Sequence, residues 1–347
     1  MIPLNGGDLH IPWQKELARA FTTPEQLLDY LGLDHGPWLE GFAARRLFPM
    51  RVPKPFADKM HPGDPADPLL RQVLPLAGEF TEVPGFVTDP LDEHDSALPG
   101  LLHKYRSRVL LVLRGGCAVN CRYCFRRHFP YADNSPGQGG WQPAVDYIAA
   151  HAEINEVILS GGDPLMAKDE HIAALLSELE CIPHLKRLRI HSRLPVVIPT
   201  RLTGTLRERL SQSRLRPVLV VHVNHANEID QDLAGRLQQW QRAGITLLNQ
   251  SVLLAGVNDD ADALEALSER LFEAGVLPYY VHQLDKVAGA AHFAVSDDHA
   301  RALMARLLER LPGFLVPRLV REIGGEVSKT PLDLNLEPVK DTPCMIR

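Results

Sequence analysis

The chain has 347 residues, 45% of them hydrophobic, so it can bury one large core or two smaller ones. Its formal net charge of −6 provides no basic field that would attract nucleic acid. No apolar run approaches the roughly 20 residues that cross a bilayer, and the N-terminal sequence MIPLNGGDLHIPWQKEL lacks the basic and then apolar order of a secretion signal. We therefore expect a cytoplasmic protein that binds neither nucleic acid nor membrane.

Residues 1–102 combine short helical patterns with irregular chain. Helical patterns cover 22–33 and 36–48, a Pro-rich stretch covers 52–75 with one short helix near its end, and the acidic stretch 79–100 is predicted to be looped. We interpret this region as a helical extension packed against the main domain. The alternative is a separately folding domain.

From residue 103 to residue 326, short apolar runs alternate with helical patterns. The helical patterns lie between six predicted strands: 108–113, 156–160, 187–192, 218–223, 245–254 and 278–284. Six such units indicate parallel strands with helices outside, and the continuous apolar runs indicate strands buried on both faces. This pattern cannot decide between a barrel and an open sheet. Residues 327–347 form a C-terminal segment.

Three of the five cysteines, Cys117, Cys121 and Cys124, have the spacing C-x3-C-x2-C. Thiolates are soft ligands that select zinc, copper(I) or iron–sulfur clusters. Three thiolates on a four-iron cluster would leave one iron open to a small molecule. Alternatives are a zinc site completed by His128, or cysteines that serve only as core residues. The other two cysteines, Cys181 and Cys344, are isolated, and this usage fits a reducing compartment.

Polar residues follow several predicted strands, at the end where barrel enzymes build their active sites. The second strand ends in SGGDPL (160–165), where glycines would let the backbone approach a ligand closely; an ordinary turn with Asp163 as a helix cap is the alternative. The third strand leads into Ser192 and Arg193. The fifth carries the polar run 249–251 inside an apolar stretch, and a bound ligand could provide the hydrogen-bond partners that buried polar groups need.

The pattern C-x3-C-x-aromatic-C resembles the signature of radical S-adenosylmethionine enzymes. The resemblance implies a 4Fe-4S cluster whose open iron chelates S-adenosylmethionine, and an electron from the cluster that releases a 5′-deoxyadenosyl radical. It also implies a partial (β/α)6 barrel of TIM type. The S-adenosylmethionine contacts that it implies are Gly161, Gly162, Asp163 and Ser192.

Residues 75–335 resemble the lysine 2,3-aminomutase family, on NQSVLL, LDKVAGAAHF and the GG-x3-K element that ends at Lys329. The resemblance implies that Lys329 forms a Schiff base with pyridoxal 5′-phosphate, although a lysine on such a loop is more often an exposed charge. It also implies that Lys104 and Arg108 bind the cofactor phosphate and that Gln250 lies near the pyridoxal ring. For the substrate, it implies that Arg126 binds the carboxylate and that Asp285 and Glu322 bind the distal ammonium. Without the resemblance, these would be a solvated basic face and surface carboxylates.

Three positions depart from the family pattern. The family has Arg where this chain has Lys104, Asp where it has Glu322, and in its longer members a zinc-binding Cys where it has Asp260. The chain thus resembles the short form, which converts (S)-α-lysine to (R)-β-lysine for elongation factor P. The partners implied are L-lysine, a flavodoxin or ferredoxin, and a functional link to elongation factor P and its lysyl ligase. We also expect a homo-oligomer. The alternatives are an aminomutase for arginine or glutamate, or a non-catalytic iron–sulfur or zinc-binding protein.

Overall fold

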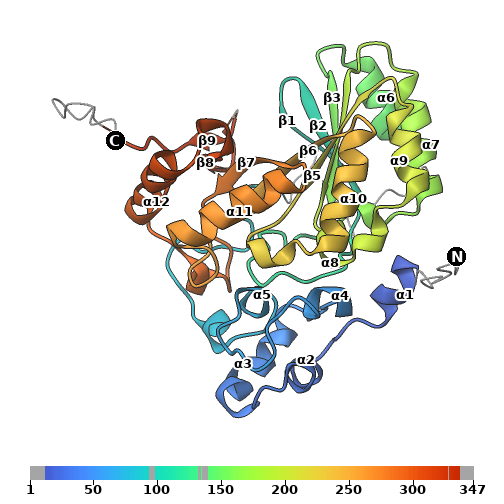
Figure 1. The fold of residues 1–347 in the computed structure, drawn as a ribbon. Coiled ribbons are helices and arrows are strands. Elements are labelled where there is room, and N and C mark those ends of the chain that lie inside the picture. Colours follow the sequence, from blue (N-terminus) through green and yellow to red (C-terminus); the bar gives the residue numbers. More distant parts are fainter. Residues whose placement is uncertain (1–11, 94–97, 132–133, 135–139, 327, 337–347) are drawn as a thin grey trace, which may run out of the picture.

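A computed structural model describes residues 12–93, 98–131, 134, 140–326 and 328–336, so Cys344 lies outside the described residues. The strands form one sheet whose spatial order follows the chain (Figure 1). Their bounds are β1 Leu101–Tyr105, β2 Arg108–Arg114, β3 Glu156–Gly161, β4 Arg187–Ser192, β5 Arg216–Val221, β6 Thr246–Val252, β7 Leu277–His282, β8 Arg318–Arg321 and β9 Thr330–Pro331.

Strands β2 to β8 are parallel, each paired with the next one along the chain, while β1 and β9 are antiparallel edges. A sheet that winds in one direction without reversal is barrel-like, and among the described strands its two edges do not pair with each other. The predicted α/β partial barrel is therefore confirmed. The count of six strands was too low, because β8 also joins the parallel set. With only Leu319 and Val320 between two arginines, β8 has too short an apolar run to be seen in the sequence.

Helices follow the strands as the pattern predicted, and Figure 1 shows α7, α9 and α10 along one face of the sheet. Several begin at a side chain that accepts a hydrogen bond from the backbone N–H three residues on, for example Thr203, Asp230, Asp260 and Ser296. Their bounds are α6 Gln142–Ala150, α7 Asp169–Glu180, α8 Leu194–Val197, α9 Gly204–Ser211, α10 Gln231–Arg242, α11 Ala261–Glu273 and α12 Asp297–Arg310.

The N-terminal region contains short helices: α1 Trp13–Ala18, α2 Pro24–Leu31, α3 Leu39–Phe42, α4 Lys54–Ala57 and α5 Pro68–Arg71. The single helix predicted over 36–48 is wrong. The segment divides into the 3-10 turn Gly36–Trp38, helix α3 and the 3-10 turn Ala43–Arg46, because Gly36, Pro37 and Gly41 weaken a continuous helix.

One hydrophobic core joins the extension to the barrel. Leu27, Phe56 and Leu69 belong to the same buried cluster as the strand residues Leu111 and Leu159. Shared burial of this kind favours an extension packed against the barrel over a separate domain. The proposed boundary between residues 102 and 103 falls inside β1. Among the described residues, no helix is long and apolar enough to cross a membrane.

Candidate active site

A cavity of about 540 Å³ runs along the strands, from Arg108 and Glu156 at the amino ends of β2 and β3 to Gly161 and His282 at the carboxyl ends of β3 and β7. All but one of the residues to which the resemblances assign a cofactor or substrate contact line this cavity, although they come from positions as distant as 104 and 329. They are Lys104, Arg108, Cys117, Cys121, Cys124, Arg126, Gly161, Gly162, Asp163, Gln250, Asp285, Glu322 and Lys329. The exception, Ser192, is buried behind Asp163, to which its hydroxyl donates at 2.7 Å.

The loop that carries the three cysteines is held by the N-terminal extension. Arg51 donates to the carbonyl of Cys117 at 2.9 Å, and the backbone N–H of Arg122 donates to the carbonyl of Gln72 at 2.9 Å. The buried guanidinium of Arg122 binds Glu79, with Nε–Oε1 at 2.8 Å, and also donates to the backbone carbonyl of Phe48. The extension therefore sets the position of the cysteine loop.

Two of the three thiols, those of Cys117 and Cys124, lie in an environment that disfavours unbound thiolates. Burial raises the pKa of Cys117 well above its usual range, with a further contribution from Cys124. Burial and the neighbouring Cys121 raise the pKa of Cys124 to about 11. Bound iron would compensate the charge of all three thiolates, so this donor set fits a cluster. Among the described residues, no three His, Cys, Asp or Glu side chains are grouped around the position of a single metal ion.

The Gly-Gly-Asp motif after β3 packs against the chain itself. A Cβ on Gly161, whose φ is +116°, would lie 2.6 Å from the carbonyl oxygen of Arg114, and one on Gly162 would lie 2.7 Å from that of Gly115. The Asp163 carboxylate accepts from Ser192 Oγ and from three backbone N–H groups, at 2.7–2.9 Å. Both of its oxygens are therefore used within the protein. These bonds fix the carboxylate at the turn after β3, and because Asp163 also lines the cavity, its contact with S-adenosylmethionine stays a prediction.

Lys329 lies near two acids, Glu322 and Asp285, and Glu322 in turn contacts Tyr105. The Lys329 ammonium forms an ion pair with Glu322, which also accepts from the Tyr105 hydroxyl at 3.1 Å. Burial would raise the pKa of Glu322, but Lys329 lowers it below its usual value. Nearby, Oδ1 of Asp285 is buried with no hydrogen-bond partner among the described residues, and burial together with Glu322 raises the pKa of this carboxyl to about 7. The two acids thus leave room for a second cation.

Glu93 was not singled out from the sequence, yet it forms ion pairs with two of the basic side chains that were predicted to bind anionic groups of the cofactor and the substrate. Arg126 donates to it from Nε at 2.7 Å and from Nη2 at 3.2 Å, and Lys104 Nζ lies 3.0 Å from Oε1. Arg126 Nη1 is bound to Ser160 Oγ and the Gly161 carbonyl. Glu93 lies in the acidic stretch before β1, where no local pattern distinguishes one carboxylate from another.

Three histidines at the strand ends were also missed. The Nε2 atoms of His191, His222 and His282 are buried without a hydrogen-bond partner among the described residues, and all three side chains line the cavity. Burial lowers their pKa values, that of His222 to about 3, so the imidazoles are neutral. His191 and His282 are polar residues at the carboxyl ends of β4 and β7, and His222 directly follows β5. This is the same signal that identified residues 249–251.

Of the three polar residues on β6, Asn249 is paired within the protein, while Ser251 as well as Gln250 lines the cavity. Asn249 exchanges two hydrogen bonds with the backbone of Val223, at 2.9 and 3.0 Å, and Ser251 donates weakly to the carbonyl of Tyr280. Gln250 lines the cavity. Arg108 lines it as well, with its guanidinium 4.0 Å from the centre of the Tyr105 ring.

Comparisons with known proteins bear on the predicted cluster and on the family of this chain. Residues 106–187 match a family described as a 4Fe-4S single cluster domain, which confirms the predicted cluster. The chain is 58% identical to an L-lysine 2,3-aminomutase of Escherichia coli (strain K12), over 93% of this chain and 95% of the relative. It is 54% identical to an L-lysine 2,3-aminomutase of Haemophilus influenzae, over 92% of this chain and 94% of the relative. A crystal structure of a radical SAM methyltransferase from Sphaerobacter thermophilus covers 64% of this chain and 68% of its own, with a TM-score of 0.45 and 16% identity.

Proposed function

Since the chain belongs to the lysine 2,3-aminomutase family of radical S-adenosylmethionine isomerases, we propose that it converts L-lysine to (R)-β-lysine. The observation that carries this proposal is the convergence of Cys117, Cys121 and Cys124 with Lys329 on one cavity. When bound, the cluster with S-adenosylmethionine supplies one-electron chemistry and pyridoxal 5′-phosphate carries the migrating nitrogen.

In this proposal the protein supplies ligands, charge and orientation. The three thiolates would hold the cluster, Lys329 would hold pyridoxal 5′-phosphate, and Lys104 with Arg108 would bind its phosphate. Lys104 provides a point charge and Arg108 a planar fork. Gln250, on the cavity wall, would lie near the ring. The neutral imidazoles of His191, His222 and His282 can donate or accept a hydrogen bond, whichever a bound cofactor requires.

The two acids near Lys329, Glu322 and Asp285, favour a cationic side chain on the substrate. Lys329 neutralises Glu322 in the ligand-free chain, and it would leave this acid when it engages the cofactor. The distal ammonium of lysine can then pair with Glu322 and with the unpartnered Asp285. An anionic side chain such as that of glutamate would be repelled. Arginine meets the same charge requirement and is the second candidate.

The substrate carboxylate would bind Arg126, but Glu93 currently holds that guanidinium. We infer that the two carboxylates exchange, so that Glu93 keeps a buried cation paired until the substrate arrives. The exchange replaces one charge-assisted hydrogen-bonded pair by another.

The test is anaerobic reconstitution with iron, sulfide, S-adenosylmethionine and pyridoxal 5′-phosphate, followed by chiral analysis of the products from L-lysine, L-arginine and L-glutamate. We expect (R)-β-lysine, made only from L-lysine. Lys329→Ala should make no product. It should also lose the covalent adduct between Lys329 and pyridoxal 5′-phosphate, which borohydride reduction traps for detection by mass spectrometry. Lys286→Ala, at an exposed lysine next to Asp285, should keep both. A trapped adduct that persists in K329A would contradict the role of Lys329.

We also propose that the product serves the modification of elongation factor P in the cytoplasm, with a flavodoxin or ferredoxin as reductant. The support is the resemblance to the short family form: Asp260, in place of a zinc-binding Cys, caps α11 by accepting from the Ala263 N–H at 2.8 Å. The check is mass spectrometry of elongation factor P after incubation with its ligase and the reaction mixture. If elongation factor P stays unmodified, the proposed link to this factor is wrong, whereas the aminomutase proposal is unaffected.

A further inference from the structure

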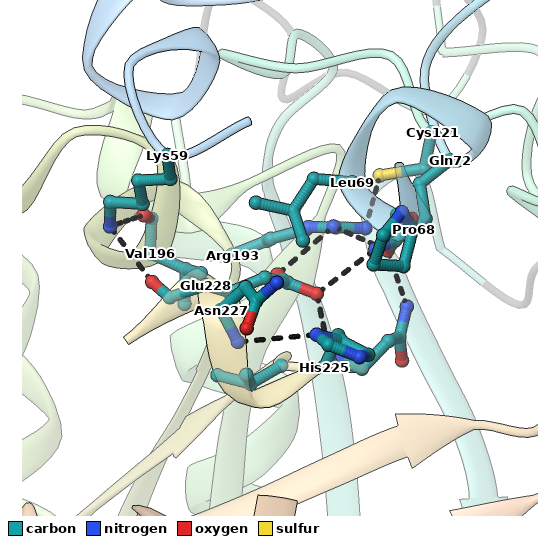
Figure 2. Close-up of polar contacts among 12 residues, drawn as sticks. Lys59, Pro68, Leu69, Gln72, Cys121, Arg193, Val196, His225, Asn227 and Glu228 are labelled. Carbon is teal, nitrogen blue, oxygen red and sulfur yellow. Dashed lines mark hydrogen bonds and ion pairs between the residues drawn. The ribbon is translucent and has the colours of Figure 1, made fainter. Parts of the chain in front are cut away.

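A buried arginine contacts one of the cluster cysteines directly. Arg193 follows β4 and is 5% exposed, and its Nη1 donates to Cys121 Sγ at 3.0 Å (Figure 2). The same guanidinium donates from Nη2 to Gln72 Oε1 at 2.7 Å and to Glu228 Oε2 at 3.2 Å. In Figure 2, dashed lines join the guanidinium of Arg193 to Cys121, Gln72 and Glu228.

The partners of Arg193 are themselves fixed. Glu228 is fully buried, and its Oε1 accepts from Gln72 Nε2 at 3.1 Å and from two backbone N–H groups, those of Asn224 and His225. Gln72 belongs to the N-terminal extension and is also fully buried. Its Oε1 accepts from Asn224 Nδ2 at 2.9 Å. The guanidinium is therefore held against the sulfur by a network that spans the extension and two strand ends.

This geometry has a direct electrostatic consequence for a cluster bound through Cys121. One-electron reduction by an external low-potential donor adds a negative charge to the cluster and moves no proton. Hydrogen bonds to the cluster sulfurs and nearby charge are among the factors that set the potential of an iron–sulfur centre. A cation bonded to a ligand sulfur stabilises the more negative, reduced state. The nearby anion, Glu228, opposes this effect.

We propose that Arg193 raises the reduction potential of the cluster through its hydrogen bond to Cys121, and that Glu228 limits the rise. Arg193 is thus a positioning and charge-setting residue for the electron-transfer step. The inference depends on the cluster and not on the identity of the substrate, so it stands if the amino acid proves to be another one.

The chain offers a matched control for loss of a buried arginine. Arg201 is fully buried, donates to the carbonyls of Leu165 and Ala167, and forms an ion pair with Asp169 at 2.8 Å. It contacts no cysteine in any described hydrogen bond. Arg201→Gln therefore reproduces the general cost of removing a buried guanidinium without changing the charge at the cluster ligand.

The experiment is a redox titration of the reconstituted full-length protein, without S-adenosylmethionine, followed by the electron paramagnetic resonance signal of the reduced cluster. In Arg193→Gln, the ratio of reduced to oxidised cluster at a fixed potential should fall about tenfold, equivalent to about 59 mV for one electron. Glu228→Gln should shift the potential in the opposite direction, and R201Q should leave it unchanged.

Equal potentials in R193Q and the unsubstituted protein, or equal shifts in R193Q and R201Q, would overturn the proposal. If R193Q fails to take up a cluster, Glu228→Gln decides: a rise in potential supports the proposal, and an unchanged or lowered potential refutes it. Arg193→Lys, which keeps the charge, should lie between R193Q and the unsubstituted protein.

Discussion

At the scale of single residues, every nitrogen of the Arg126 guanidinium has a hydrogen-bond partner within the protein. The guanidinium donates to two oxygens of Glu93, to Ser160 and to the carbonyl of Gly161, so no open fork faces a ligand in the ligand-free chain. A buried charge without a partner is costly, and the carboxylate of Glu93 removes that cost. Substrate binding then involves competition between two carboxylates for one cation.

Replacing Glu93 by Gln should therefore strengthen binding of L-lysine. The amide keeps the shape of the side chain but competes less well for Arg126, so we expect the Kd to fall by about tenfold, or about 1.4 kcal/mol. Calorimetric titration of the cofactor-loaded protein measures it. Glu82→Gln, at an exposed position of the same segment, should change nothing. Weaker binding in E93Q would mean instead that Glu93 holds Arg126 in place for the substrate.

At the scale of elements, the extension and the cysteine loop are connected by buried charge. Glu79, in the 3-10 turn Ala77–Phe80, pairs with both Arg122 at 2.5 Å and Arg127 at 2.8 Å, and all three residues are buried. The two arginines flank Cys124 in the sequence. A single carboxylate of the extension therefore compensates two cations of the loop that carries the cluster ligands.

Removal of this carboxylate should destabilise the protein and loosen the loop. Glu79→Ala leaves two guanidinium groups buried without their anion, which costs about 3–5 kcal/mol for a broken buried pair. We expect a lower urea midpoint and less bound iron after reconstitution. Glu40→Ala, which truncates an exposed carboxylate of the same extension, serves as the control. If both variants unfold at the same urea concentration, the pairing contributes no net stability.

At the scale of the whole molecule, the parallel sheet gathers buried titratable groups at one end. Burial lowers the pKa values of His191, His222 and His282, and that of His292 to about 4. Below pH about 6.5 these histidines are protonated in the unfolded chain and neutral in the folded one. The unfolded state then binds more protons, so stability falls as the pH falls. Asp285, whose pKa is raised to about 7, binds a proton in the folded state over this pH range. Its effect on stability is opposite in sign and offsets that of one histidine.

The ligand-free protein should accordingly lose stability between pH 7.5 and pH 5.5. Each histidine that stays neutral contributes about 1.4 kcal/mol per pH unit below its unfolded pKa. Urea midpoints across this range measure the effect, and His222→Asn should reduce the dependence by the share of one group. A midpoint that does not change with pH would show that these imidazoles are protonated in the folded protein.

The local sequence determined the elements and the cofactor chemistry. Alternating apolar runs and helical patterns predicted the six strands from β2 to β7 and a helix after each of them, because hydrophobic periodicity can be recognised within a window of a few residues. The cysteine spacing predicted the cluster through its resemblance to the radical S-adenosylmethionine signature, whose three ligands lie within one loop. Strand β8 escaped because its apolar run is only two residues long.

Only the tertiary structure decided which groups meet. The pairing of Arg126 with Glu93 joins residues 33 positions apart, and that of Arg193 with Gln72 joins residues 121 positions apart. The hydrogen bonding of Asp163 depended on the same information, because its four bonds come from the turn after β3 and from the end of β4. Contacts of this kind depend on strand register and on the packing of the extension, neither of which leaves a local pattern. The sequence therefore indicated the chemistry of the cavity, and the fold decided how its charges are paired.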